Sequence, residues 1–227
     1  MIVSPGRVRV ALRCSRLAYE DNPRAALRDA GIAHLATYGR GNTQAILAFA
    51  GGDIVLAYRG TSELGDWVDD ARYVKTDFPR GGRVHTGFFE QFMAIDSDVR
   101  SDLHDFQNFP LLVTGHSLGA ALATIAGVAY RAEAGAVFGS PRVGNSGFAA
   151  QVRYSLLRFE HGTDPVTWVP PRQSPAQALH ALLHLRMPTL YVHAGAVQRV
   201  DGDLHTMSHY ERSVSQFLER LDPESGS

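Results

Sequence analysis

The sequence lacks several features that would assign it to a specialised class of protein. Its only cysteine is Cys14, so no disulfide can form within the chain and stability does not depend on an oxidising compartment. No apolar run approaches the ~20 residues that a transmembrane helix needs. The segment Met1–Val10 carries arginines between its apolar residues and lacks the continuous apolar region of a signal peptide. We therefore expect no transmembrane segment and a cytoplasmic location, with export by another route left open.

An excess of one charge and the motifs of cofactor sites are also missing. The formal net charge is −1 and the basic residues are scattered, which argues against a nucleic-acid partner or an anionic membrane surface. No G-x-G-x-x-G motif follows a first strand. The pair His205/His209 has no third metal ligand at a recognised spacing, and the pair His180/His184 lacks the glutamate of H-E-x-x-H. We expect neither a cofactor nor a metal ion.

The composition, with 44% hydrophobic and 20% charged residues, is that of an ordinary globular protein, and we expect one domain over residues 1–227. Apolar periodicity and turn residues predict helices and strands along the whole chain. The predicted helices are residues 7–19, 23–30, one long helix within 84–106, 118–129, 176–185 and 205–221. The predicted strands are residues 33–38, 44–50, 54–58, 109–113, 136–138, 156–159 and 190–192, the last pairing with 197–200.

The order of these elements predicts an α/β fold. Strands alternate with helices in the second half of the chain, which indicates a mostly parallel central sheet with helices on both faces. The strands 44–50 and 54–58 are joined by Gly51-Gly52-Asp53, a hairpin signal. The N-terminal edge of the sheet is therefore expected to be antiparallel.

The most informative motif is Gly115-His116-Ser117-Leu118-Gly119, between the predicted strand 109–113 and the predicted helix 118–129. A serine on such a tight turn is held out of the sheet, where a neighbouring base can reach its Oγ. This arrangement is typical of the α/β-hydrolase fold. A glycine-rich turn capped by serine is the alternative interpretation.

In that fold an acid and then a histidine follow the serine along the chain. The candidate acid is Asp164, in the turn after strand 156–159 and before Pro165, because catalytic groups gather at the C-terminal ends of parallel strands. An aspartate that only caps its own turn is the alternative. The candidate bases are His205, after a natural turn at 201–204, and His209, which lies one helical turn further on and is alternatively a surface residue.

Further motifs occur from one end of the chain to the other. They are LAY at 17–19, AYRGT at 57–61, DW at 66–67, VHTGF at 84–88, GHSLGAALA at 115–123, GSPRVGN at 139–145, DPV and VP within 164–170, and YVHAG at 191–195. In their identity and order they resemble the motifs of the class 3 lipases, which are fungal-lipase-like α/β hydrolases. The resemblance covers nearly the whole chain.

The resemblance implies a role for individual residues. Ser117 matches the nucleophile and Asp164 matches the acid. His205 matches the base, because the H-x-M-x-x-Y pattern of bacterial members is found at residues 205–210. In some fungal members the base is closer to the tyrosine, which keeps His209 as an alternative.

The resemblance also implies an oxyanion hole and a lid. Thr61 matches the residue that forms the oxyanion hole, and the backbone N–H of Leu118 would be the second donor. Residues 62–68 are the candidate lid and acyl-binding segment, with Leu64 and Trp67 as its apolar residues. The alternative for Trp67 is plain packing on the core.

Together these features imply a serine carboxylic-ester hydrolase, a triacylglycerol lipase or esterase that works through an acyl-enzyme. Its partners would be lipid or other ester substrates, with transient contact to a lipid interface. A phospholipase A1 and a feruloyl-type esterase are alternatives within the same class. A non-catalytic lipid-binding module on the same fold is a further alternative, which the occupied nucleophile, acid, base and oxyanion positions oppose. The acyl chain length and head group are not readable, because a fold does not fix its substrate.

Overall fold

The structure is a computed structural model that describes residues 3–61, 74–172 and 190–221. Its helices are α1 Pro5–Leu17, α2 Pro23–Asp29, α4 Thr86–Ala94, α5 Asp96–Asp105, α6 Leu118–Ala129, α7 Ser146–Ala149, the 3-10 helix η1 Pro165–Trp168, and α9 Met207–Leu221. Its strands are β1 Ala33–Arg40, β2 Thr43–Ala50, β3 Asp53–Tyr58, β4 Lys75–Asp77, β5 Arg83–His85, β6 Leu111–His116, β7 Ala134–Phe138, β8 Ser155–His161 and β9 Ala196–Val200. The predicted helix 176–185 lies outside the described residues.

Within the described residues, the central sheet has seven strands in the order β1-β2-β3-β6-β7-β8-β9. The pairs β1/β2 and β2/β3 are antiparallel, and every pair from β3 to β9 is parallel. The mostly parallel sheet with an antiparallel N-terminal edge is therefore confirmed. The hairpin between β2 and β3 is confirmed as well, because Gly51 and Gly52 both have positive φ, at 62° and 85°, as a tight hairpin turn requires.

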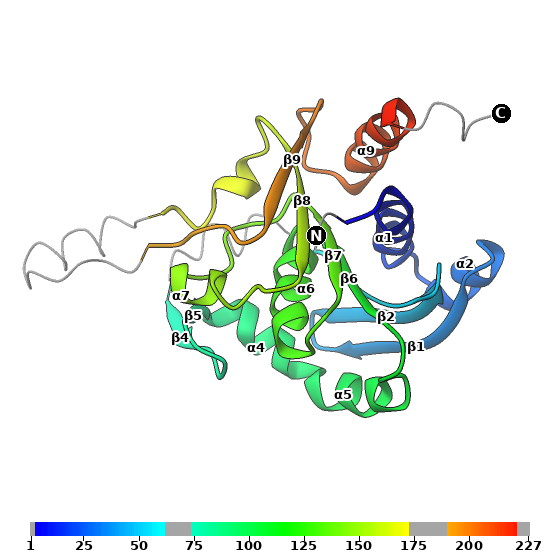
Figure 1. Ribbon diagram of the computed structural model, residues 1–227, viewed down its shortest axis with the longest axis horizontal. Coiled ribbons are helices and arrows are strands. Elements are labelled where there is room, and N and C mark those ends of the chain that lie inside the picture. The colour runs from blue at the N-terminus through cyan, green and yellow to red at the C-terminus, as the bar shows by residue number, and fades with distance from the viewer. Residues whose placement is uncertain (1–2, 62–73, 173–189, 222–227) are drawn as a thin grey trace, which may run out of the picture.

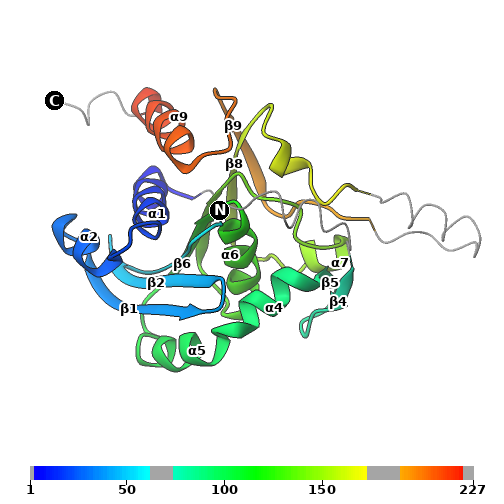
Figure 2. The same ribbon diagram turned by 180° about the vertical axis from the view of Figure 1, so that it is seen from behind.

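Helices cover both faces of the sheet, as predicted (Figure 1). Helices α1 and α9 lie side by side over one face, and α4 and α6 lie over the other (Figure 2). The alternation of side chains along β3 explains the two cores: Leu56 joins the cluster under α4 and α6, whereas Val55 and Ala57 join the cluster under α1 and α9. The sheet is thus buried on both faces at its centre.

The prediction of one long helix within residues 84–106 was wrong. Ile95, with φ −120° and ψ 5°, leaves the helical conformation and separates α4 from α5. Asp96 begins the second helix, and its carboxylate accepts hydrogen bonds from the Tyr130 hydroxyl at 2.9 Å and the Arg100 guanidinium at 2.8 Å. The bond to Tyr130 is long-range and the bond to Arg100 is local, and together they fix the break between the two helices. The apolar periodicity that predicted one helix gives no sign of this break.

The predicted pairing of residues 190–192 with residues 197–200 was also wrong. Val192 instead forms an isolated bridge with Gly144, and its N–H donates to the Gly144 carbonyl at 2.8 Å. The chain then turns at Gly195, which has a φ of 79°. Strand β9 runs parallel to β8 and completes the edge of the sheet.

Helix length and polarity bear on the relation to membranes. Over the residues that the structure describes, no helix combines the length and the apolar character needed to cross a bilayer.

Candidate active site

The candidate nucleophile lies at a strained turn between β6 and α6. Ser117 has φ 59° and ψ −125°, an unusual conformation for a residue other than glycine. The turn needs small flanking residues, because a Cβ on Gly115 would lie 2.4 Å from the carbonyl carbon of Gly119, and a Cβ on Gly119 would lie 2.3 Å from the carbonyl oxygen of Tyr58. The two glycines of the motif therefore let α6 approach the ends of β3 and β6.

The oxyanion candidates flank this serine. The chain leaves β3 and passes Ser117 so closely that a Cβ on Gly60 would lie 3.3 Å from the serine Cβ. The next residue is Thr61, whose Oγ1 is buried and has no hydrogen-bond partner among the described residues. Leu118 is the first residue of α6, where a backbone N–H has no partner within the helix. The N–H of Ser117 itself donates to the Phe138 carbonyl at 3.0 Å.

The candidate acid receives three hydrogen bonds. Asp164 is fully buried in the turn after β8. Its Oδ1 accepts from the Val166 N–H at 2.9 Å, and its Oδ2 accepts from His205 Nδ1 at 2.6 Å and from the Tyr210 hydroxyl at 2.7 Å. Burial tends to raise the pKa of the Asp164 carboxyl, but these donors, His205 foremost, outweigh burial and hold that pKa below its usual value. Asp164 therefore caps its own turn and also orients a histidine.

His205 lies between this acid and the serine turn. Because the Asp164 carboxylate accepts from Nδ1–H, the other ring nitrogen, Nε2, carries a lone pair in the neutral ring. Among the described residues neither His205 Nε2 nor Ser117 Oγ has a hydrogen-bond partner. The His205 ring stacks on His116, the residue before the serine, with ring centroids 4.7 Å apart. The fold thus holds His205, through Asp164, against the residue that precedes the buried Ser117.

His116 has a supporting place in this arrangement. Burial lowers its pKa to about 3, and burial raises the pKa of Tyr19 to about 12. A neutral His116 accordingly shares a 2.8 Å hydrogen bond between its Nδ1 and the Tyr19 hydroxyl. Tyr19, just after α1, thereby fixes the ring on which His205 stacks.

Sequence reasoning missed the roles of His161 and Tyr210. The two rings stack at a centroid distance of 3.9 Å. The backbone N–H of His161 donates to the Tyr210 hydroxyl at 3.0 Å. His161 Nδ1 also lies 2.8 Å from the carbonyl oxygen of Leu204, the residue before His205. The tyrosine of the H-x-M-x-x-Y pattern was the available signal, but nothing in the sequence pairs it with the end of β8.

The remaining candidates lie elsewhere. His209, on α9, hydrogen-bonds through Nδ1 to the Thr206 hydroxyl at 2.6 Å and is not bonded to Asp164. The candidate lid residues Leu64 and Trp67 lie outside the described residues. In the part of the chain that the structure describes, no group of three His, Cys, Asp or Glu side chains is arranged to hold a metal ion.

Comparisons with known proteins identify the family of this chain. The family model described as lipase (class 3) matches residues 55–174. The "Secreted mono- and diacylglycerol lipase A" of Penicillium cyclopium is 35% identical over 130 residues, which cover 52% of this chain and 43% of that protein. "Phospholipase A1-II 6" of Oryza sativa subsp. japonica is 32% identical over 178 residues, which cover 57% of this chain and 42% of that protein. The chain thus spans less than half the length of these curated relatives.

The fold is found among solved structures. The triacylglyceride lipase of Rhizomucor miehei superimposes with a TM-score of 0.70 at 21% identity, over 86% of this chain and 79% of that one. At this identity the likeness concerns the fold, and it identifies the sheet and its covering helices as an α/β-hydrolase fold.

Replacing Tyr210 tests how the candidate acid is held. Tyr210→Phe removes the hydroxyl that donates to Asp164 and accepts from the His161 N–H, so we expect a loss of about 1–3 kcal/mol in the free energy of unfolding. The ionised carboxylate, whose pKa is lowered in the folded state, stabilises the protein above the ordinary carboxyl pKa of ~3.9, and this contribution is lost as the pH falls through the folded pKa. The difference in the free energy of unfolding between wild type and Tyr210→Phe, measured by chemical denaturation, should therefore become smaller at acidic pH.

A matched control is Tyr38→Phe. Tyr38 lies on β1, far from the candidate site, and its hydroxyl donates to Asp102 at 2.7 Å. Asp102 is partly exposed, so water can replace the lost donor and the loss should be smaller. Equal losses for the two variants would contradict a special role of Tyr210.

Proposed function

Because this chain belongs to the class 3 lipase family, whose model matches just over half of it, we propose that it is a serine carboxylic-ester hydrolase acting on acylglycerols or similar lipid esters. The observation that carries the proposal is the 2.6 Å hydrogen bond from His205 Nδ1 to the buried Asp164 carboxylate, made by a histidine that stacks against the serine turn. These contacts support the role that each group has in the proposed reaction.

In the proposed reaction, Ser117 Oγ attacks the ester carbonyl carbon while His205 Nε2 accepts the serine proton. Asp164 holds the ring in the required tautomer and stabilises the imidazolium. The Leu118 N–H and Thr61 donate to the oxyanion; a single such donor is worth roughly 2.7–4 kcal/mol of barrier.

The imidazolium then gives its proton to the leaving alcohol, and an acyl-enzyme remains on Ser117. Water attacks the acyl carbonyl with His205 again as base, which releases the carboxylic acid and restores the serine. Every proton transfer is made by His205, so the scheme needs no cofactor or metal ion.

The substrate class is supported by relatives and by the surface beside the site. One relative is named for mono- and diacylglycerols. Trp168 follows the Asp164 turn and Leu204 precedes His205, and both are about half exposed, at 54% and 49%. Large apolar side chains at the rim of a site favour transient contact with a lipid interface.

A phospholipase A1 is the second candidate, because a rice relative carries that name. A feruloyl-type esterase is not among the relatives named above. A non-catalytic lipid-binding module is disfavoured by the aligned His205 and Asp164, since binding alone does not require a buried histidine–carboxylate pair.

Labelling with a fluorophosphonate probe tests the nucleophile. We expect the probe to form one covalent adduct, at Ser117, identified by mass spectrometry of peptides. Ser117→Ala should abolish labelling and lower kcat by several orders of magnitude with the fold intact by circular dichroism. An active Ser117→Ala variant, or adducts only at other residues, would refute the assignment and favour the non-catalytic module.

The base is tested by comparing His205→Ala with His209→Ala. His205→Ala should leave only residual activity, because the serine proton then has no acceptor. His209→Ala should remain close to wild type, because His209 bonds to Thr206 and not to the acid. Wild-type activity should fall as the pH is lowered, since an imidazolium cannot accept a proton. The reverse ranking of the two variants would exchange their roles.

Trp67 is proposed to cover or line the acyl-binding site. Ser117 is fully buried in this structure, so neighbouring residues must move before a substrate can reach it. Trp67→Ala should lower kcat/KM for long-chain p-nitrophenyl esters more than for the acetate ester, because only long chains extend beyond the reacting carbonyl. Phe109→Ala is the control, because Phe109 is an exposed aromatic residue just before the start of β6, at the opposite end of that strand from Ser117. Equal effects of Trp67→Ala on short and long esters would indicate plain core packing.

A further inference from the structure

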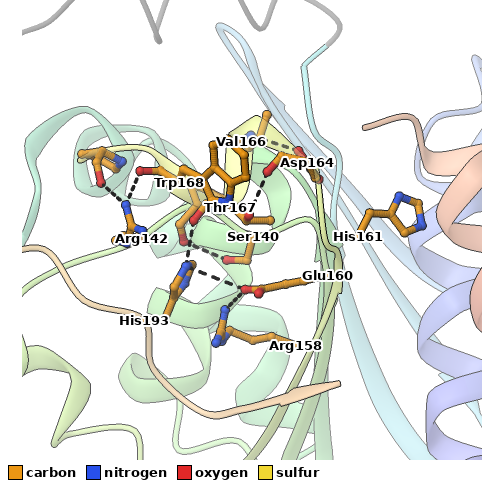
Figure 3. A network of polar contacts seen from close by, with 12 residues as sticks. Ser140, Arg142, Arg158, Glu160, His161, Asp164, Val166, Thr167, Trp168 and His193 are labelled. Atoms are coloured by element: carbon orange, nitrogen blue, oxygen red, sulfur yellow. Dashed lines mark hydrogen bonds and ion pairs between the residues drawn. The ribbon is translucent and has the colours of Figure 1, made fainter. Parts of the chain in front are cut away.

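A second group of polar side chains lies on the side of the Asp164 turn away from His205 and α9. The carbonyl groups of η1 are held there by side chains from two other segments (Figure 3). His193 Nε2 lies 2.8 Å from the Thr167 carbonyl oxygen. The Arg142 guanidinium donates to the carbonyls of Trp168 and Pro170, the latter at 2.9 Å. The turn that presents the acid is therefore fixed on its far side as well.

The Thr167 contact continues to Asp164 itself. The Thr167 hydroxyl donates to the Asp164 carbonyl oxygen at 2.8 Å, and Thr167 is 3% exposed. Thr167 thus accepts from His193 with its carbonyl and donates with its hydroxyl to the backbone carbonyl of Asp164. A displacement of the His193 ring would be transmitted to the backbone of Asp164 through a single residue.

A buried ion pair on β8 lies behind His193. Arg158 and Glu160 are two residues apart, so their side chains project from the same face of the strand, and they are paired. Glu160 Oε1 lies 3.7 Å from His193 Nε2. The Arg158 side chain is only 7% exposed. Buried ion pairs are weak sources of stability because both ions lose their hydration, so stability alone does not account for this one.

The burial of His193 and the charges around it determine its protonation state. Burial lowers its pKa to about 3, and the positive charges of Arg158, Arg142 and Arg172 act in the same direction. The ring is therefore neutral, and its approach to Glu160 is not an ion pair. A carbonyl can only accept, so the single ring proton sits on Nε2, facing Thr167. The negative charge of Glu160 near Nε2 favours this tautomer over the one protonated on Nδ1.

We propose that His193 is a positioning residue for Asp164, and that Glu160, held by Arg158, fixes the tautomer in which His193 donates to Thr167. This inference rests on the proposed function, in which Asp164 orients the base. The hydrogen bonds from His193 to Thr167 and from Thr167 to Asp164 fix the position and orientation of the turn. In this position Asp164 Oδ2 accepts from His205 Nδ1, and Asp164 Oδ1 accepts from the Val166 N–H. Misplacement of a reacting group by ~1 Å can cost ~100-fold in rate, so a partial displacement should be visible in kcat.

The test compares His193→Leu with His193→Gln. Leucine fills similar space without a donor, whereas the glutamine amide nitrogen can donate near the position of Nε2. We expect His193→Leu to lower kcat by about 10-fold with little change in KM, and His193→Gln to recover most of the loss. In ¹⁵N-labelled protein, the proton resonance of His205 Nδ1–H, which reports its bond to Asp164, should move in the leucine variant and return towards the wild-type position in the glutamine variant.

Two further variants complete the experiment. Thr167→Val removes only the hydroxyl that donates to Asp164 and should move the same resonance, which gives a second test if His193→Leu does not fold. His34→Leu is the control, since His34 lies on β1 and bonds to Thr37 at 2.7 Å; it should leave kcat and the resonance unchanged.

The outcomes separate this inference from the proposed function. Loss of thermal stability in His193→Leu with unchanged kcat and an unchanged resonance would overturn the positioning role. An unmoved resonance in both His193→Leu and Thr167→Val would do the same. If the wild-type protein hydrolyses no ester, the proposed function fails, while the resonance still reports whether His193 positions the Asp164 carboxylate.

Discussion

A buried negative charge organises the site. The Asp164 carboxylate has no exposed surface, and an ionised carboxylate removed from water is stable only where donors or opposite charge surround it. Its donors come from its own turn at Val166, from His205 in the loop before α9, and from Tyr210 on α9 itself. The orientation of His205 and Tyr210 is therefore a consequence of solvating one charge, while apolar side chains of α9, among them Val214 and Leu218, pack in the core beneath it.

The serine turn places a second constraint on the fold. Non-glycine residues at positive φ typically cost of the order of 1–3 kcal/mol, and Ser117 adopts such a conformation between two buried elements. Every residue of α6 is buried, so the packing of this helix against β3, β6 and α4 holds the turn in place. Small residues make that close packing feasible, which explains why the motif and the helix after it form one apolar, glycine- and alanine-rich stretch.

The sequence was informative where local chemistry determines structure. The flanking strand and helix of Ser117, the Gly51-Gly52 hairpin and the parallel core were predictable, because turn residues and apolar periodicity are local signals. The break at Ile95 was not, since it depends on a bond from Asp96 to Tyr130, which is 34 residues away. The pairing of residues 190–192 failed for the same reason: Val192 bonds to Gly144, and no sequence pattern records that contact.

At the candidate site, too, local features were predictable from the sequence and long-range contacts were not. Asp164 and His205 were identifiable as candidates from their order and turn context, and the structure brings them together at 2.6 Å. The choice between His205 and His209 stayed open in the sequence because both follow Asp164 near the start of the predicted helix 205–221, and because the resemblance allows a base closer to the tyrosine. The stacking of His116 on His205 and the contact of Tyr210 with Asp164 were missed, because each joins elements that are remote in the chain.

The Asp164 turn is supported from two opposite sides. Tyr210 and His205 reach the carboxylate from the side of α9, and His193 reaches the backbone of the turn through Thr167 from the other side. Because both sets of contacts act on one group, their energetic effects are coupled, as expected for residues that share a hydrogen-bond network. A substitution among the contacts on one side of the turn alters the position of Asp164, and the contacts on the other side must adjust to it. The orientation of His205 thus depends on all the contacts around Asp164, and both sets of contacts converge on the turn that follows β8.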